Sequence, residues 1–178
     1  MKYLLLILAF TVFNNKLSAQ DDKTVTKIFI VRHAEKQTGS DPLLTTSGNK
    51  RAGDLMRKLQ NEGIQKIYVS KTRRTQNTGD SLRIQLNIDT VHYVADTVCE
   101  KLISTIMEHS DFGKTILIIG HSNTIPQIIR KLGVHDYPYG DIPDNDFDDL
   151  FVITYKNEKA KLKKMKYGDK SGVSAAMQ

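Results

Sequence analysis

Two histidines in this chain each follow a short run of apolar residues, and both have the chemistry to act on one substrate. His33 comes after Ile28–Val31 and Arg32, and His121 comes directly after Ile116–Gly120. A neutral imidazole is a nucleophile at neutral pH, and an arginine fork holds phosphate oxygens in pairs while staying protonated. Together these residue types predict chemistry on a phosphoryl group, although either histidine alone is equally well an ordinary polar residue where a strand ends.

The apolar runs before the histidines predict the elements that position them. Continuous Ile, Leu and Val runs are typical of strands buried on both faces of a parallel sheet, and such sheets bind ligands beyond the carboxyl ends of their strands. Strands are predicted at Ile28–Arg32, Lys66–Val69, Thr90–Val94 and Thr115–Ile119. Helices are predicted at Thr45–Glu62, Thr72–Ile84, Thr97–His109 and about Thr124–Leu132. This alternation predicts an α/β fold, a layered helix/sheet/helix domain with a mostly parallel central sheet.

Local signals place the ends of some helices. Thr45 or Thr46 is suited to cap the first helix, and Gly63 follows its end. The helix over Thr97–His109 is expected to turn its apolar residues inward. These residues are Val98, Leu102, Ile103 and Ile106.

The last part of the chain follows a different pattern. Leu150–Tyr155 and Lys161–Tyr167 flank a short charged turn, which predicts a C-terminal hairpin at the edge of the sheet. Before it, Val134–Asp149 is rich in Asp, Pro, Gly and Tyr and predicts a long surface loop that overhangs the site. Tyr137 and Tyr139 then either line the entrance or belong to an ordinary solvated loop.

The first 19 residues differ in kind from the rest of the chain. Lys2 gives a positive start, the run from Tyr3 to Phe13 is almost wholly apolar, and the polar stretch after it ends in Ser18 and Ala19. This pattern is typical of a secretory signal peptide, and its apolar run is short for a membrane span. We therefore expect an exported protein, periplasmic or extracellular, with no membrane span after cleavage near Ala19.

Length and composition predict one domain with its own core. The chain has 178 residues, of which 39% are apolar and 26% are charged, as in ordinary globular proteins. The expected organisation is a signal peptide over residues 1–19, a linker over 20–26, one domain over 27–170 and a flexible tail over 171–178.

Charge and cysteine content argue against several classes of protein. The formal net charge of +6 falls by two when residues 1–19, which hold Lys2 and Lys16 and no acid, are removed. Much of the remaining positive charge lies in Lys156–Lys166, and alternating lysines more often keep a sheet edge soluble than bind nucleic acid. Cys99 is the only cysteine, which excludes an internal disulfide, and the chain has no CxxC or HExxH metal motif. We expect neither a nucleic-acid partner nor a metal site.

Four short motifs occur in a fixed order along the chain. They are Val31-Arg32-His33-Ala34-Glu35-Lys36, Leu44-Thr45-Thr46-Ser47-Gly48 with Arg51-Ala52, Val69-Ser70-Lys71-Thr72-Arg73-Arg74-Thr75-Gln76-Asn77-Thr78, and Ile119-Gly120-His121-Ser122-Asn123. In this order they resemble the histidine phosphatase superfamily, the phosphoglycerate-mutase-like proteins. The resemblance runs from about Ile28 to the terminal hairpin, and each motif stands at a predicted strand end or helix start.

The resemblance implies a role for each matching residue. His33 matches the family's nucleophile, which becomes a phosphohistidine during the reaction. Arg32, Arg74 and His121 match its phosphate clamp, in which His121 would be protonated. Because arginines and histidines neutralise the phosphoryl charge in place of Mg²⁺, no cofactor is expected.

Two further assignments follow from the same motifs. Arg74 is preferred to Arg73 for the clamp because it is the fourth residue after Ser70, as the family pattern has it, and Arg73 is expected to be exposed. Ser122 and Asn123 are expected to add hydrogen bonds to the phosphate near a helix start.

The proton donor for the leaving group is the residue that the motifs specify least. The branch that resembles phytases and acid phosphatases has an acid directly after the second histidine, where this chain has Ser122. The mutase-like branch draws a glutamate from the stretch before that histidine, which makes Asp96 and Glu100 the candidates. Asp96 is equally suited to cap a helix. Glu35 and Asp41 are further alternatives.

These observations predict a secreted or periplasmic phosphatase that hydrolyses phosphomonoesters through a phosphohistidine intermediate. The short stretch between Arg74 and His121 leaves no room for a large substrate-binding cap, which favours an open site and a small phosphorylated substrate. One alternative is a catalytically weak, phosphate-binding relative of the family. Another is a serine esterase that uses Ser122, although its motif has Thr124 where a nucleophile elbow has glycine. No oligomeric state follows from the sequence.

Overall fold

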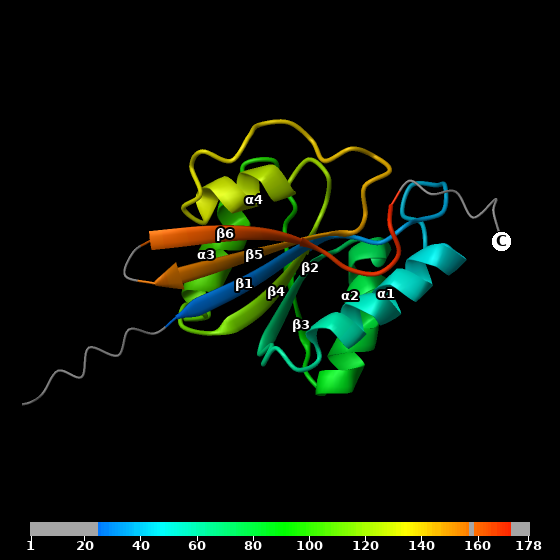
Figure 1. Cartoon of the computed structure of the whole chain (residues 1–178), viewed down its shortest axis with the longest axis horizontal. Coiled ribbons are helices and arrows are strands. Elements are labelled where there is room, and N and C mark those ends of the chain that lie inside the picture. The colour runs from blue at the N-terminus through cyan, green and yellow to red at the C-terminus, as the bar shows by residue number, and fades with distance from the viewer. Residues whose placement is uncertain (1–24, 157–158, 172–178) are drawn as a thin grey trace, which may run out of the picture.

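A six-stranded sheet forms the centre of the protein in the computed structural model, which describes residues 25–156 and 159–171 (Figure 1). The strands are β1 (Thr26–Arg32), β2 (Lys66–Ser70), β3 (Thr90–Tyr93), β4 (Thr115–Gly120), β5 (Asp149–Lys156) and β6 (Lys159–Lys166). Their order across the sheet is β3-β2-β4-β1-β5-β6. The first four strands pair in parallel, whereas β5 and β6 add an antiparallel hairpin at one edge. The predicted α/β class, with its mostly parallel sheet and C-terminal edge hairpin, is confirmed.

Helices cover both faces of this sheet (Figure 1). In the described part of the chain they are α1 (Thr46–Leu59), α2 (Arg73–Leu86), α3 (Glu100–Glu108) and α4 (Ile125–Lys131). Leu55 and Leu59 of α1 and Leu82 of α2 pack on one face. Leu102 of α3 and Ile128 of α4 pack on the other.

Strand β1 shows how an unbroken apolar run builds both layers. Ile28 and Ile30 belong to the core under α3 and α4, whereas Phe29 and Val31 belong to the core under α1 and α2. Successive side chains of a strand point to opposite faces, so a strand covered on both sides needs apolar residues throughout. Burial of each such side chain contributes about 1.5–3 kcal/mol to stability.

The register of the central strands brings the two histidines together. β1 pairs in parallel with β4 so that Arg32 lies opposite Gly120. The backbone N–H of His33 continues this pairing and donates to the Gly120 carbonyl over 3.0 Å. His121 directly follows β4, and the centroids of the two imidazole rings lie 5.4 Å apart.

The start of helix α1 agrees with the sequence prediction, whereas the start of α3 differs from it. Thr45 caps α1, since its Oγ1 accepts a hydrogen bond from Gly48 N over 3.1 Å. Helix α3 begins at Glu100 and not at Thr97, because Cys99 has a left-handed backbone with φ of 56°. Val98 therefore lies outside the helix and is 56% exposed, so the expectation that it faces the core is wrong.

The segment between α4 and β5 is the long loop predicted from composition, but its tyrosines do not form an entrance together. Tyr137 is half-buried on the core, with its ring edge-on to Phe151 at 5.9 Å between centroids. Tyr139 is exposed and lies against the Arg130 guanidinium, 3.8 Å from the ring centroid. The interpretation of Tyr137 as an entrance residue is wrong because its ring completes the apolar core.

The predicted termini fall largely outside the described residues. The predicted signal peptide lies wholly in the part of the chain before residue 25, and all of the predicted tail except Ser171 lies after residue 171. Among the described residues, no helix has the length and apolar character needed to cross a bilayer.

Candidate active site

His33 is held in one tautomer by the backbone carbonyl of the next residue, Ala34. The ring is buried, and its Nδ1 lies 2.8 Å from the Ala34 carbonyl oxygen. Because a carbonyl only accepts, Nδ1 carries the proton and Nε2 keeps its lone pair. Burial, followed by the charges of His121, Arg32 and Arg74, lowers the pKa of His33 to about 3, although the Ala34 contact opposes this change. At neutral pH His33 is an uncharged imidazole with an available Nε2, the state that a nucleophile requires.

His121 has its two ring nitrogens fixed by different partners. Its Nδ1 lies 3.4 Å from Arg74 Nη2, and its Nε2 lies 3.0 Å from Ser70 Oγ. An arginine only donates, so Nδ1 accepts and Nε2 donates to Ser70. Burial, and then the charges of Arg74 and Arg32, lower the pKa of His121 to about 4. The ring is therefore neutral by itself, which differs from the protonated state that the family resemblance implies, and a bound phosphate dianion would favour protonation.

Arg32 is buried at the end of β1, and residues of the loop before β5 contact its guanidinium. Its Nη1 donates to the Pro143 carbonyl over 2.8 Å and lies 3.4 Å from the Asp146 carbonyl. The Phe147 ring stacks on the guanidinium, with 4.3 Å between the guanidinium carbon and the ring centroid. The exposed Asp144 carboxylate lies 3.6 Å from Nη2. These contacts fix the arginine fork beside His33.

The two neighbouring arginines at the start of α2 have different environments. Arg74 is largely buried, with Nη2 against His121 and Nη1 at 3.9 Å from Asp41 Oδ1. Arg73 is exposed, and its backbone N–H donates to the same Asp41 oxygen over 3.0 Å. Asp41 thus caps the helix start and contacts Arg74. The structure places Arg74 at the site and Arg73 outside it, as the family pattern implies.

The arginines at the site retain donors that protein groups do not use. The Nε atoms of Arg32 and Arg74 are both buried, and neither has an acceptor within residues 25–156 and 159–171. An unpaired buried donor is costly, and a guanidinium donor is costlier than a neutral one. Two such donors beside two neutral histidines make a site suited to an anion with several oxygens, such as a phosphoryl group.

Asp96 lies in the connection after β3 and contains an unpaired buried carboxylate. Both of its oxygens are buried, and neither accepts a hydrogen bond from the described residues. The helix after it starts only at Glu100, with Cys99 as its first cap, so the interpretation of Asp96 as a helix cap is wrong. β3 is parallel to β2, so Asp96 follows a carboxyl end on the same side of the sheet as the histidines. Its carboxyl group is thus uncommitted, within the described residues, at the end of the sheet that carries the histidines.

Glu100 belongs to the surface. Its side chain is 72% exposed and lies 3.5 Å from Lys131 Nζ. Lys131 is the last residue of α4, whereas His121 precedes the start of that helix. The contact therefore draws Glu100 towards the far end of α4, and the structure does not bring it to the histidines.

Ser122 and Asn123 follow His121 but have no fixed side-chain partners in the described part of the chain. Ser122 is half-buried, and its carbonyl accepts from Ile142 N over 3.1 Å, which ties the loop before β5 to the site. Asn123 is exposed. Their positions beside His121 leave both side chains available to a ligand. The ring nitrogens of His121 contact Ser70 and Arg74, so Ser122 lacks the histidine that activates an esterase serine.

Three residues support the site without having been predicted from the sequence. Ser70 holds His121, and Phe147 covers Arg32 and lies 6.1 Å from His33 between ring centroids. Thr78 accepts from Ala34 N over 2.9 Å and donates to the Arg74 carbonyl over 2.7 Å, which joins the loop after β1 to α2. Ser70 and Thr78 lie within the third motif, whereas nothing in the local sequence marks Phe147.

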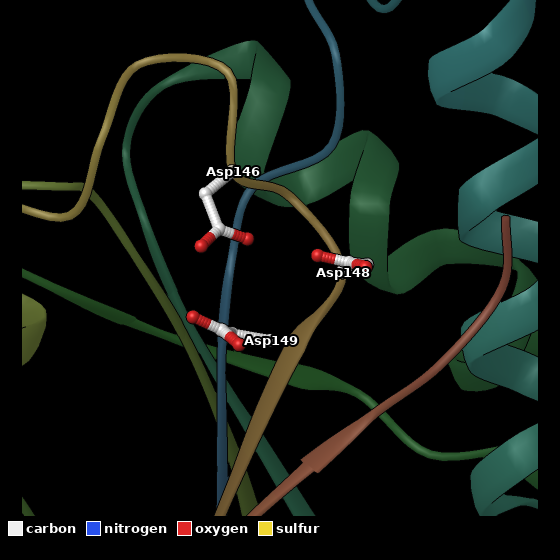
Figure 2. A group of neighbouring side chains, drawn as sticks. All are labelled: Asp146, Asp148 and Asp149. Atoms are coloured by element: carbon white, nitrogen blue, oxygen red, sulfur yellow. The ribbon is translucent and has the colours of Figure 1, made fainter. Parts of the chain in front are cut away.

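Three aspartates form the one group in the described residues whose spacing would suit a metal ion. Figure 2 shows Asp146, Asp148 and Asp149 turned towards one another where the loop enters β5, with oxygens of all three within 4.8 Å. Lys166 Nζ contacts the same carboxylates at 3.3, 2.8 and 2.8 Å, respectively. The positive charge at this cluster is therefore supplied by the protein itself.

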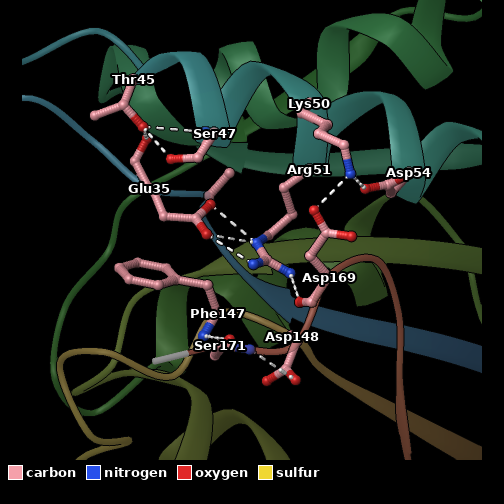
Figure 3. Close-up of polar contacts among 12 residues, drawn as sticks. Glu35, Thr45, Ser47, Lys50, Arg51, Asp54, Phe147, Asp148, Asp169 and Ser171 are labelled. Carbon is pink, nitrogen blue, oxygen red and sulfur yellow. Dashed lines mark hydrogen bonds and ion pairs between the residues drawn. The ribbon is translucent and has the colours of Figure 1, made fainter. Parts of the chain in front are cut away.

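Glu35, a further candidate acid, is committed to a partly buried ion pair with Arg51. Figure 3 shows its carboxylate facing Arg51, whose Nε lies 2.9 Å from each of its oxygens and whose Nη2 lies 2.7 Å from Oε1. Arg51 also donates to the Asp169 carbonyl over 3.0 Å. Gly48 passes so close that a Cβ would collide with the Glu35 carbonyl. The second motif thus packs α1 against the loop that carries His33, and Glu35 is not available as a proton donor.

The part of the chain that carries most of these site residues matches the model of a known protein family. Residues 28–97 match the model of the histidine phosphatase superfamily (branch 1), a region that includes Arg32, His33, Arg74 and Asp96. No curated protein sequence gives a match.

Several solved structures share the fold. A mycobacterial glucosyl-3-phosphoglycerate phosphatase has a TM-score of 0.61 and 11% identity, over 80% of this chain and 98% of the other. The protein histidine phosphatase SixA, complexed with tungstate, has a TM-score of 0.58 and 20% identity, over 79% and 96%. Phosphoglycerate mutase from Bacillus anthracis has a TM-score of 0.61 and 15% identity, over 81% and 94%. At these identities the likeness concerns the fold.

Proposed function

The chain belongs to the histidine phosphatase superfamily, and we propose that it is a phosphatase that hydrolyses phosphomonoesters through a phosphohistidine intermediate on His33. The observation that carries the proposal is the state of His33, a neutral buried ring whose Nδ1 is bound to Ala34 and whose Nε2 is available beside two arginines. Phosphatases among the structural neighbours, one of them with the phosphate mimic tungstate, support the same reaction class.

The first step forms a bond between His33 Nε2 and phosphorus while the bond from phosphorus to the ester oxygen breaks. Arg32 and Arg74 bind the phosphoryl oxygens through the donors that the protein leaves unpaired. His121 keeps its Nε2 bond to Ser70, and the protonation that a phosphate dianion favours gives it a second N–H, on Nδ1, to donate to a further oxygen. Because phosphoryl transfer depends chiefly on positioning and neutralisation of charge, we assign both tasks to this set of donors.

The leaving oxygen needs a proton, and we assign it to Asp96. Protonated Asp96 donates to the departing alkoxide, and the resulting carboxylate then accepts a proton from the water that attacks the phosphohistidine. That second step breaks the bond between phosphorus and Nε2, releases phosphate and restores both residues. The burial and unpaired state of Asp96 favour it over the exposed Glu100.

The substrate we propose is a small phosphorylated molecule outside the cytoplasm. The signal-like residues 1–19 support export to the periplasm or the medium. N-terminal sequencing of the protein purified from the extracytoplasmic fraction tests this part, and a start near Gln20 is the expected result. Recovery of the full-length chain from the cytoplasm alone would contradict it.

The decisive experiment is a trapping assay. The wild-type protein is mixed briefly with a ³²P-labelled phosphomonoester and quenched in denaturant, beside a His33→Ala variant. Acid-labile, alkali-stable label on the wild type alone is the expected result, together with turnover of p-nitrophenyl phosphate. Label that survives acid, or that appears on the variant, would exclude the phosphohistidine. Binding of vanadate without turnover would instead identify a phosphate-binding relative that has lost catalysis.

A further inference from the structure

Lys166 lies at the end of β6 and contacts all three aspartates of the cluster Asp146, Asp148 and Asp149. Figure 2 shows these three carboxylates turned towards one another. Two of these carboxylates are almost fully buried, Asp148 and Asp149 at 3% exposed each. Their contacts raise the pKa of Lys166, and the pKa of Asp148 is lowered because hydrogen bonds from Lys166 and Ser171 outweigh its burial. Charges of this kind are costly to bury unless they are paired, so the cluster depends on its ammonium group.

The cluster overlaps the segment that holds Arg32, because Asp146 belongs to both, and Asp148 and Asp149 follow directly. Pro143 and Asp146 supply the two carbonyl oxygens near Arg32 Nη1, and Phe147 supplies the ring stacked on its guanidinium. This segment has no strand or helix of its own. Its position over Arg32 therefore depends on contacts at its two ends, which are the backbone bond from Ile142 N to the Ser122 carbonyl on one side and the aspartate cluster on the other.

The segment after β6, from Tyr167 to Ser171, also contacts this loop (Figure 3). Ser171 Oγ accepts from Phe147 N over 2.8 Å, and Ser171 N donates to Asp148 Oδ2 over 3.2 Å. Tyr167 N donates to the Asp148 carbonyl over 3.0 Å. Asp148 thus receives the charge of Lys166 on one oxygen and the Ser171 backbone on the other.

We propose that Lys166 is a positioning residue for phosphate binding, a tethered cation that gathers Asp146, Asp148 and Asp149 and so fixes the Pro143–Phe147 segment over Arg32. This inference rests on the proposed function, because it treats Arg32 as part of the phosphate clamp. By this arrangement the end of β6, which makes no contact with Arg32, controls how firmly the site binds a phosphoryl group.

The residue types alone would suggest a divalent cation here, since three carboxylates are typical ligands of Ca²⁺ or Mg²⁺. The geometry assigns that place to the Lys166 ammonium, which lies within 3.3 Å of every carboxylate in the cluster. The cluster borders a surface hollow of about 440 Å³ that Lys166 and Ser171 also line. A soluble cation therefore has access to the cluster once the lysine side chain is removed.

The chain offers a matched control for a test of this role. Lys164 lies on the same strand, is 51% exposed where Lys166 is 54% exposed, and pairs with Asp149 alone at 2.7 Å. Lys166→Met and Lys164→Met therefore remove the same charge from the same strand. Only the first change removes the contacts to Asp146 and Asp148.

Two measurements are made on the purified mature protein. The first is hydrogen exchange at the Phe147 and Ser171 amides, which reports the loop independently of any activity. The second is the Kd for inorganic phosphate, with kcat and KM for p-nitrophenyl phosphate. In Lys166→Met we expect faster exchange at both amides and about a tenfold rise in Kd and KM, with a smaller change in kcat, because His33 and Arg74 do not depend on this loop. Lys164→Met is expected to match the wild type.

Two additions separate a positioning role from a general loss of structure. Lys166→Arg is expected to restore the phosphate Kd, and millimolar Ca²⁺ is expected to restore it partly in Lys166→Met but to leave the wild type unchanged. Wild-type exchange rates or a wild-type Kd in Lys166→Met would overturn the proposal, as would equal effects of the two methionine variants. A wild-type protein that binds neither phosphate nor vanadate would overturn the proposed function and the link to Arg32 together, whereas the exchange rates would still report whether Lys166 fixes the loop.

Discussion

The candidate site combines residues carried on strand ends with residues carried on loops, and the two groups are held in different ways. Arg32, His33 and His121 follow β1 and β4, so their separation is set by the paired backbone of the sheet. Asp96 and Phe147 lie on connections without regular structure, and Phe147 is positioned by Ser171, far along the chain. The strand-borne group supplies the nucleophile and most of the clamp, whereas the loop-borne group supplies the proton and the cover over Arg32. We therefore expect bond formation to depend on the first group, and leaving-group chemistry and affinity to depend on the second.

The largest effect is expected at the nucleophile. His33→Ala should lower kcat for p-nitrophenyl phosphate by about 10⁴-fold or more, because no other group in the strand-borne set can form the covalent intermediate. Vanadate binding should remain, since Arg32 and Arg74 keep their donors. The control is His92→Ala, at an exposed position on β3. A His33→Ala enzyme within tenfold of the wild-type rate would place the nucleophile elsewhere.

The next effect separates two adjacent arginines. Arg74→Ala should lower kcat/KM by about 10²–10³-fold, because its guanidinium neutralises charge that develops on the phosphoryl oxygens. Arg73→Ala should stay within about twofold of the wild type, since that side chain is exposed and surface changes away from a site have small effects. Steady-state kinetics of both variants decide the assignment. Equal losses in the two would mean that the start of α2 acts through its fold and not through Arg74.

The strand-borne residues were accessible from the sequence because their signals are local. An apolar run such as Ile28–Val31 predicts a strand buried on both faces, and the residues after it must lie at a carboxyl end. The same logic places His121, and the order of motifs identifies Arg74 over its neighbour. The register that brings the rings to 5.4 Å is a property of the pairing of β1 with β4, which the sequence pattern does not specify.

The loop-borne residues were only partly accessible because their positions depend on distant partners. Asp96 was one of two candidate acids and was equally suited to cap a helix, and only the left-handed backbone of Cys99 delays the helix and leaves the carboxylate unpaired. Phe147 has no local signal, since its place over Arg32 follows from contacts with Ser171. Lys166 was interpreted as one of several lysines that keep an edge strand soluble, although it is the one that contacts three aspartates.

A smaller effect, and one that depends on the substrate, is expected at the proton donor. Asp96→Asn should slow hydrolysis of an alkyl phosphate by about 10²-fold, because the alkoxide leaves only with a proton, and should slow p-nitrophenyl phosphate by less than about tenfold. Glu100→Gln, at an exposed residue paired with Lys131, should match the wild type for both substrates. An equal loss for both substrates in Asp96→Asn would indicate a structural role, and a selective loss in Glu100→Gln would reverse the assignment.

The two histidines also make stability depend on pH. Burial lowers the pKa of His33 to about 3 and that of His121 to about 4, below the ordinary value of 6.5. Between these values the unfolded chain binds more protons than the folded protein, so their contribution is fully present above about pH 6.5 and is lost as pH falls from there. The free energy of unfolding should fall by at most about 1.4 kcal/mol per pH unit for each histidine. Urea unfolding at pH 7 and 5 should show a smaller difference in His121→Gln than in the wild type, and an unchanged difference would contradict the low pKa.

The smallest effect tests whether His121, one of the strand-borne residues, needs a side-chain contact from a neighbouring strand to hold its ring. Ser70 is the last residue of β2 and accepts from His121 Nε2, so Ser70→Ala frees the His121 ring to rotate but leaves the donors of Arg32 and Arg74 in place. We expect kcat/KM to fall by about 3–10-fold, the cost of one hydrogen bond to a neutral ring. Thr72→Val is the matched control, since Thr72 bonds to Ser70 but not to His121. If both changes were silent, the backbone pairing of β4 alone would orient His121, and the strand-borne half would be rigid without side-chain support. A loss near that of Arg74→Ala would instead mean that His121, though carried on a strand end, depends on side-chain contacts as strongly as the loop-borne residues do.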